Sequence, residues 1–288
     1  MQRYYKKYAP VFLIPLLICF LIAFLVPFCM GVFYSFTDFN TLTNFQFNGI
    51  KNFQYIFKGQ SDSPIPTFWV AFGRTSLFAV VSIVTINFNA FILALLLTKG
   101  LRGSNVYRSI FFLPNLIGGI VLGYIWKLIL NGILQLMGTN LSSNPWYSFF
   151  GLVILMNWQQ VGYMMIIYIA ALMNVPEDLN ESAEIDGASK FKTTMHVTIP
   201  MVIPSFTICT FLTLTNSFKL YDQNIALSGN SITTNLLAAD IVGTVKPIVD
   251  GLGQSYGPQQ AKSLLFFIIV AIISGIQVFA TRKKEVEA

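Results

Sequence analysis

The amino-acid sequence predicts an all-α, polytopic membrane protein with six transmembrane helices. Of its 288 residues, 55% are hydrophobic and only 10% are charged, whereas an average soluble domain has about 25% charged residues. The hydrophobic residues form runs close to or beyond the roughly 20 residues that an α-helix needs to cross a bilayer. We therefore expect a single transmembrane domain over residues 1–288. Its predicted spans are about 10–36, 68–98, 108–130, 149–173, 197–218 and 263–281.

The first apolar run follows three cations, Arg3, Lys6 and Lys7. A secretory signal peptide also begins in this way, but its apolar core is about 7 to 15 residues long and ends at small residues. The run here is roughly 27 residues long, enough to span a bilayer. The segment from Phe28 to Phe36 offers no small-residue cleavage site. We therefore expect a retained span.

The lysine and arginine residues are distributed unevenly between the two sides that six spans define. Eleven lie in the termini and the loops on the same side, and five lie in the loops on the opposite side. Loops rich in Lys and Arg remain in the cytoplasm, so we expect both termini to be cytoplasmic. Membrane orientation thus accounts for the net charge of +6, and no nucleic-acid partner is expected.

Two further cations, Arg74 and Lys127, lie inside apolar runs. In the predicted topology each is near the outer end of its span, where a long side chain can reach the membrane surface. Such snorkelling is the favoured interpretation. A charge within a membrane is costly unless it is paired, so a contact with substrate or a partner remains the alternative.

The sequence offers no catalytic or metal-binding constellation. Cys19, Cys29 and Cys209 all fall in apolar runs, where a cysteine behaves as a small hydrophobic residue. His196 is the only histidine. The segment that begins at Gly187 resembles a P-loop only superficially, because it lacks the second glycine and a preceding strand. We expect neither an enzyme nor a cofactor on this chain.

The loop over residues 174–199 is polar and lies between two apolar runs. Pro176 can begin a helix there, and Gly187 can end it in the left-handed conformation that favours glycine. Ser189 can cap a second short helix, which carries Phe191. A connector that lies on lipid is expected to be rich in Lys and Arg, yet acids outnumber bases here by five to two. The loop is therefore predicted to bind a protein partner.

Several motifs resemble one family of membrane proteins. The loop pattern of Glu, two small residues, and a Gly four positions later, followed by Ile-Pro, is similar to the coupling loop of permease subunits of ATP-binding-cassette (ABC) importers. Within that family, the chain resembles the sugar permeases of the maltose, glycerol-phosphate and multiple-sugar type. Ser182 stands where the family more often has Ala, and Arg74 where it more often has Asn. The segments that carry the resemblance are SFTDFN at 35–40, FNGIKNFQYIF at 47–57, residues 113–138, residues 158–188 and NSFKLYDQNIALSG at 216–229.

The resemblance implies a type I ABC importer permease fold in a bacterial cytoplasmic membrane. It also implies cytoplasmic coupling helices that dock in a groove of the ATPase. The implied partners are a second related permease, two ATPase subunits that bind ATP and Mg²⁺, and an extracellular solute-binding protein. A sugar or oligosaccharide would be moved by alternating access. The implied coupling residues are Glu181, Ser182, Ala183, Asp186, Gly187, Phe191 and Pro200.

Polar and aromatic residues in the fourth and fifth spans are the candidate lining of a sugar cavity. Sugar hydroxyls need hydrogen-bonding partners, and polar side chains in a span face a cavity or protein rather than lipid. Polar side chains also join neighbouring helices, so for any one residue helix packing is the favoured alternative. The candidates are Asn157, Trp158, Gln159, Tyr163, Thr213, Asn216 and Phe218.

Two other functions remain open at this point. A secondary transporter or channel not coupled to ATP is expected to show inverted repeats or ionisable residues near the membrane midplane, and neither is evident. A membrane scaffold that only anchors an ATPase predicts no stimulation by substrate. The sequence does not identify the transported solute.

Overall fold

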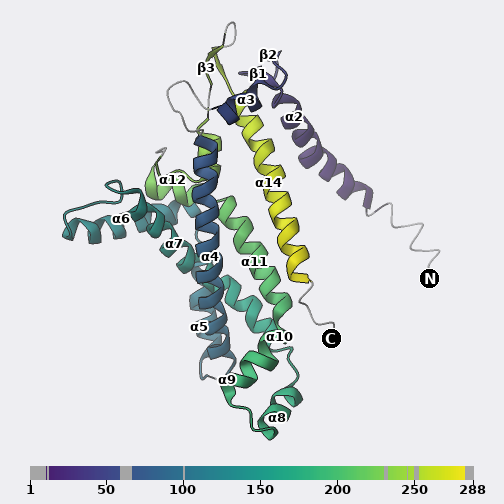
Figure 1. Ribbon diagram of the computed structural model, residues 1–288, viewed down its shortest axis with the longest axis vertical. Helices are drawn as coiled ribbons and strands as arrows, with labels where there is room; N and C mark the ends of the chain where they lie inside the picture. Colours follow the sequence, from purple (N-terminus) through teal and green to yellow (C-terminus); the bar gives the residue numbers. More distant parts are fainter. Residues whose placement is uncertain are drawn as a thin grey trace. The chain divides into compact units, whose positions relative to one another are not determined.

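The computed structural model describes residues 11, 13–58, 67–99, 101–229, 233–244, 246–249 and 253–282 (Figure 1). Two compact units are formed, one by residues 1–68 with 241–268 and the other by residues 69–240 with 269–288. We call them unit 1 and unit 2. Helix α4, Thr67–Thr98, begins in unit 1 and continues in unit 2, and helix α14, Gly257–Arg282, does the same.

Within the described ranges, five helices are long and apolar enough to cross a membrane, and a bent pair makes a sixth candidate. The bent pair joins Lys190–Met201 to α11, Ile203–Phe218, at an angle of 69°. This result confirms the predicted helical, multi-pass fold. The five helices are Leu13–Tyr34, which ends in α2 (Val26–Tyr34), then α4, α6 (Gly119–Leu136), α7 (Pro145–Leu172) and α14.

Unit 1 contains two small hairpins beside its helices. Strands β1, Thr37–Phe39, and β2, Phe45–Phe47, pair antiparallel, and α3, Lys51–Lys58, follows them. Strands β3, Lys246–Val249, and β4, Gly253–Ser255, form the second hairpin.

Asn52, in α3, explains part of the FNGIKNF motif in structural terms. Its side chain is 1% exposed and donates hydrogen bonds to the carbonyl oxygens of Ser35, at 3.1 Å, and Thr37, at 2.8 Å. The β1–β2 hairpin is joined to β4 by Ser255, whose hydroxyl donates a hydrogen bond to the Asp38 carboxylate at 2.9 Å. The motif thus fixes the chain as it leaves the first span.

Unit 2 is built around α7, the most buried of the long helices. Tyr168, near its end, is fully buried, packs against Phe91 of α4 and Phe206 of α11, and donates a hydrogen bond to Asn87 of α4 at 2.7 Å. α7 therefore contacts both neighbouring spans at one point.

The third predicted span, 108–130, is not one continuous helix. Helix α5 covers Ser104–Phe112, a 3₁₀ turn covers Leu113–Leu116, and α6 begins only at Gly119. Pro114 has no N–H to continue the α-helical hydrogen bonds, and the backbone is extended at Ile117 and Gly118, with ψ of 132° and 140°. The apolar composition predicts a continuous span, whereas the structure interrupts the helix between Leu113 and Gly118.

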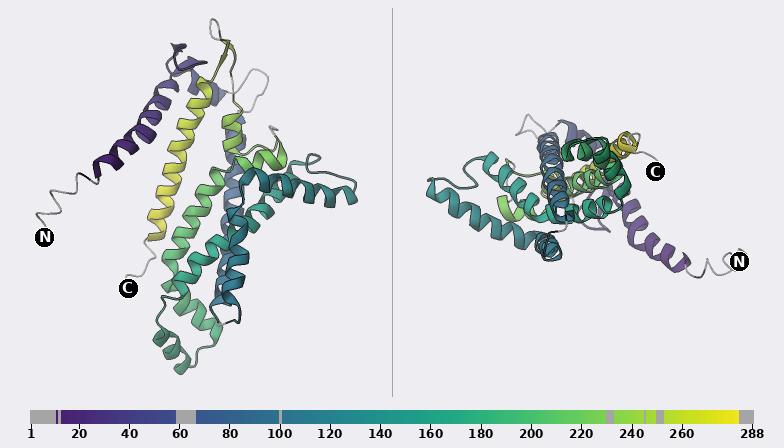
Figure 2. Two further views of the ribbon diagram at one scale, coloured as in Figure 1. Left: turned by 180° about the vertical axis from the view of Figure 1, so that it is seen from behind. Right: turned by 90° about the horizontal axis from the view of Figure 1, so that it is seen from below.

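The long connection after α11 has structure of its own. It contains α12, Asp222–Ser228, and α13, Leu237–Val242. Helix α12 packs along α6, and the two lie side by side in Figures 1 and 2. Gly123 of α6 permits this approach, because a Cβ there would be 2.5 Å from the Cβ of Ala226.

Candidate functional site

Helix α8, Glu177–Ile185, forms the first half of the loop between α7 and α11. Glu177 and Asp178 occupy its first turn, where negative charge opposes the positive end of the helix dipole. Two hydrogen bonds close its end: Gly187 N–H to Glu184 O at 3.0 Å, and Ala188 N–H to Ala183 O at 2.9 Å. This is a Schellman motif.

Gly187 occupies the left-handed position of that motif, with φ of +77°. The predicted helix end is therefore present at the predicted glycine. Nothing lies within 4 Å of the position that a Cβ would take, so the requirement for glycine is one of backbone conformation and not of space.

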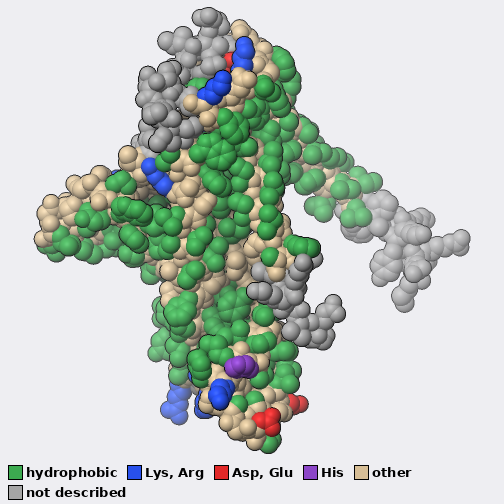
Figure 3. Space-filling view, in the orientation of Figure 1, with side chains coloured by type: hydrophobic (Ala, Val, Ile, Leu, Met, Phe, Trp, Pro, Cys, Tyr) green, Lys and Arg blue, Asp and Glu red, His purple; other side chains and the backbone are tan. Residues whose placement is uncertain are grey.

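Helix α9, Lys190–Thr193, forms the second half and is capped by Ser189, which accepts a hydrogen bond from Lys192 N–H at 3.4 Å. Phe191 projects from it and is 70% exposed, and Ile185 of α8 is 86% exposed. Figure 3 shows charged side chains and the histidine gathered at this loop. Two large apolar side chains thus stand exposed on a polar loop.

The remaining predicted coupling residues lie on the same loop. Glu181 and Asp186 are exposed, and the Ser182 hydroxyl donates to Asp178 O at 2.7 Å. Ala183 and Pro200 are half-buried. Pro200 lies in α10, Ile199–Met201, at the bend into α11. A π-helical turn over Thr194–Thr198 connects α9 to α10 and contacts both α8 and α9, so the loop packs as one element.

The polar residues of α7 are joined to other helices. The Asn157 side chain donates hydrogen bonds to the Thr85 hydroxyl of α4 and to the Val153 carbonyl oxygen of α7, both at 2.9 Å. Its amide oxygen accepts a hydrogen bond from the Asn89 side chain of α4 at 3.2 Å. Asn89 is exposed and Asn157 is half-buried. An exposed amide in a span is unfavourable against lipid, so this face of α4 and α7 is suited to a water-filled cavity or to another protein.

A second set of amides joins α7 to α11 and α12. Gln160 accepts a hydrogen bond from Asn216 of α11 at 3.1 Å, and Gln159 accepts one from Gln223 of α12 at 3.0 Å. Gln159 also donates to Ile117 O, in the break between α5 and α6, at 3.4 Å. The helix interruption and the polar side of α7 therefore meet.

The other predicted cavity residues divide into two groups. Trp158 is 46% exposed and packs edge-on against Trp126 of α6, and Tyr163 is half-buried. Thr213 and Phe218 of α11, by contrast, are 0% and 2% exposed. The structure thus brings Asn157, Gln159 and Asn216 into hydrogen-bonded networks, whereas Thr213 and Phe218 contribute to packing within unit 2.

Sequence reasoning did not identify several residues that belong to this region. Asn87 and Asn89 stand out as polar residues in the apolar run of the second span, and Gln223 follows the fifth span. That polarity was the available signal, but their partners on α7 are 64 to 81 positions away. Among the described residues, no three His, Cys, Asp or Glu side chains gather as metal ligands.

The several apolar helices, the amide networks between them and the polar loop at one end define a polytopic membrane protein. Residues 90–284 match the family described as the binding-protein-dependent transport system inner membrane component. The chain belongs to this family. The resemblance inferred from the loop motif is thereby confirmed.

Individual relatives are similar over almost their full length. The probable starch degradation products transport system permease protein AmyD of Thermoanaerobacterium thermosulfurigenes is 39% identical, covering 96% of this chain and 94% of AmyD. The multiple sugar-binding transport system permease protein MsmF of Streptococcus mutans is 29% identical, covering 98% of this chain and 97% of MsmF.

A solved structure shares the fold. It is the crystal structure of a bacterial ABC transporter involved in the import of the acidic polysaccharide alginate. The match has a TM-score of 0.78, covers 98% of each chain and is 19% identical in sequence. At this identity the likeness concerns the fold alone.

Proposed function

We propose that this chain is the permease subunit of an ATP-driven importer that moves a sugar or oligosaccharide into a bacterial cell by alternating access. Family membership supports the role in binding-protein-dependent transport. The names of AmyD and MsmF refer to starch degradation products and to multiple sugars, which supports a carbohydrate substrate. The amide groups of α7 and α11 have the chemistry that sugar hydroxyls require.

We call the segment from α8 to α9, residues 177–193, the α8–α9 loop. The exposed Phe191 on this loop is the main support for the coupling role. Phe191 is a large apolar side chain, and it is 70% exposed on an acidic loop. Burial of this side chain against a partner protein would lower the free energy of the complex. We propose that it docks in a groove of an ATPase subunit together with Glu181, Ser182, Ala183, Asp186 and Gly187, while Pro200 links the loop to α11. ATP and Mg²⁺ would be bound by the ATPase and not by this chain.

The remaining partners follow from the same proposal. A second related permease would complete the translocation path, two ATPase subunits would drive it, and an extracellular solute-binding protein would deliver the sugar. Both termini and the α8–α9 loop would face the cytoplasm, which agrees with the excess of Lys and Arg on that side.

Substitution of Phe191 tests the coupling role. In the reconstituted transporter, Phe191→Ser is expected to reduce both sugar uptake and the ATP hydrolysis that the binding protein stimulates. Truncated interface anchors typically cost about 2 kcal/mol or more, or roughly 30-fold in affinity. Co-purification of the ATPase should weaken in parallel.

Phe88→Ser is the matched control. Phe88 lies on α4 and is 64% exposed, so it has the same side chain at a similar exposure but lies away from the loop. Its replacement should leave ATPase co-purification intact. Wild-type ATPase binding and uptake by the Phe191 variant would refute the docking role, and uptake without any ATPase subunit would favour a secondary transporter.

A further inference from the structure

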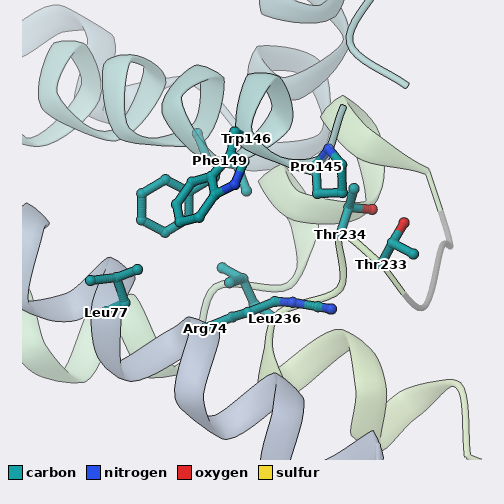
Figure 4. A pocket seen from close by; sticks show the side chains of 9 residues that line it. Arg74, Leu77, Pro145, Trp146, Phe149, Thr233, Thr234 and Leu236 are labelled. Carbon is teal, nitrogen blue, oxygen red and sulfur yellow. The ribbon is translucent and has the colours of Figure 1, made fainter. Parts of the chain in front are cut away.

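A pocket in unit 2 remains outside the sites described above. It lies between the first part of α4, the beginning of α7 and the segment that precedes α13, and it encloses about 450 Å³, including open space at its mouth. Figure 4 shows Trp146 and Phe149 on one wall and Arg74 and Leu77 on the other. The Arg74 side chain points toward the end of the pocket where Thr233 and Thr234 lie.

The polar and apolar groups of this pocket are separated. The guanidinium of Arg74 and the two threonines provide its polar end, and the rings of Trp146 and Phe149 and the side chain of Leu77 provide its apolar side. Trp146 is 54% exposed. Exposed tryptophan at the end of a span is typical of the membrane–water interface, which favours a position of the pocket near the lipid headgroups.

An apolar stripe continues from the pocket along α4 into the span. Leu77, Val80 and Val84 are 45%, 60% and 63% exposed, and their spacing places them on one face of the helix. From Leu77 to Val84 this face is roughly 10 Å long. It offers an acyl chain a path that begins beside the cationic group.

The charge of Arg74 suits a phosphate. Guanidinium and phosphate form paired, charge-assisted hydrogen bonds. The charge of Asp240 also acts on Arg74, but Asp240 does not line the pocket. A guanidinium can interact with a carboxylate and a phosphate at the same time, because its five N–H donors point in several directions.

We propose that this pocket binds an anionic phospholipid, with the headgroup phosphate on Arg74 and one acyl chain along Leu77, Val80 and Val84. In the orientation proposed above, the lipid belongs to the outer leaflet. The pocket shares no lining residue with the candidate sugar cavity or with the loop that carries α8 and α9.

The test measures lipid retained by the purified, fully assembled transporter. Detergent micelles are supplemented with phosphatidylglycerol or with diacylglycerol of the same chains, and the lipid bound to each complex is quantified by mass spectrometry. The wild type should retain phosphatidylglycerol in preference. Arg74→Gln should lower that retention roughly 10- to 100-fold, the range for a lost hydrogen bond to a charged group, while Arg74→Lys should retain part of it.

Lys127→Gln is the matched control, because Lys127 is another cation of a span that does not line the pocket. It should behave as the wild type. Equal phosphatidylglycerol retention by wild type and Arg74→Gln overturns the proposal. Glycerol phosphate that displaces the lipid completely overturns it in favour of a soluble phosphate compound. Cross-linking of Val80→Cys to the second permease overturns the lipid path in favour of a protein interface.

Discussion

Gly187 and Gly162 show that two glycines of this chain are needed for different physical reasons. Gly187 has a positive φ and open space around it. Gly162 is an ordinary helical residue of α7, but a Cβ there would overlap the carbonyl group of Phe111. One position requires a conformation, and the other requires the absence of a side chain.

At Gly187, we predict that Val impairs coupling without preventing membrane insertion. A β-branched residue in the left-handed conformation costs about 1 to 2 kcal/mol or more, so α8 should lose its defined end. Uptake into vesicles and ATP hydrolysis stimulated by the binding protein should both fall. If the strain energy reduces the free energy of docking to the ATPase, the decrease should be roughly tenfold.

Gly187→Asn is the control for this prediction, because Asn tolerates the left-handed region. It should restore most of the activity. If Val at this position supports normal uptake, the helix end has no role in coupling.

At Gly162, we predict a loss of stability and not of one activity. Gly162→Ala should force α7 away from the end of α5, at a cost of about 1 to 3 kcal/mol for an overpacked contact. The midpoint of thermal unfolding and the yield of the assembled complex should fall together. Gly132→Ala in α6, where nothing lies within 4 Å of the added Cβ, should leave both unchanged.

At the scale of elements, α7 makes polar contacts with three other helices of the described residues. Its amides bind α4 through Asn157, α11 through Gln160 and α12 through Gln159. A helix with these connections can line a cavity and also hold its neighbours in place. The candidate residues therefore need to be separated by experiment into those that contact sugar and those that pack.

We predict that Tyr163 and Phe218 separate in this way. Tyr163→Phe removes only a hydroxyl from a half-buried residue. If that hydroxyl binds sugar, the order of preference among sugars should change, with a loss of about 1 to 3 kcal/mol for the group left unpaired. Phe218→Ala leaves a cavity at a buried position and should lower the free energy of unfolding by about 3 kcal/mol.

Alanine at Asn157 and at Asn216 extends the comparison. Both variants lose hydrogen bonding between helices. One such bond contributes about 0.6 kcal/mol in a membrane, so the unfolding temperature of each variant should fall slightly. A larger, substrate-dependent loss of uptake would place these residues in the cavity. If every variant lost uptake only in step with stability, and the preference among sugars never changed, the cavity assignment would be wrong.

At the scale of the whole molecule, we predict that the chain neither binds nor hydrolyses ATP alone. The P-loop-like segment at Gly187 is the end of α8 and the capped start of α9, not a strand followed by a glycine-rich loop. The purified chain, alone or with the second permease, should show no nucleotide binding by calorimetry. Specific nucleotide binding after removal of all ATPase subunits would contradict the assignment of ATP to a partner.

The sequence by itself determined the parts of this protein that depend on local composition. Apolar runs long enough for a bilayer indicated the spans, because partition into lipid depends on the residues of each segment. Gly187 indicated the end of α8 for a similar reason, since a helix end depends on a few adjacent residues. The loop motif indicated the family.

Only the tertiary structure decided which faces meet. Asn157 bonds to Asn89, 68 positions away, and the pocket at Arg74 is formed by three separate segments. The burial of Phe218 was likewise not readable from its position at the end of an apolar run. Such features depend on contacts between distant segments, and hydrophobicity along a single helix fixes its preference for lipid but not its neighbours.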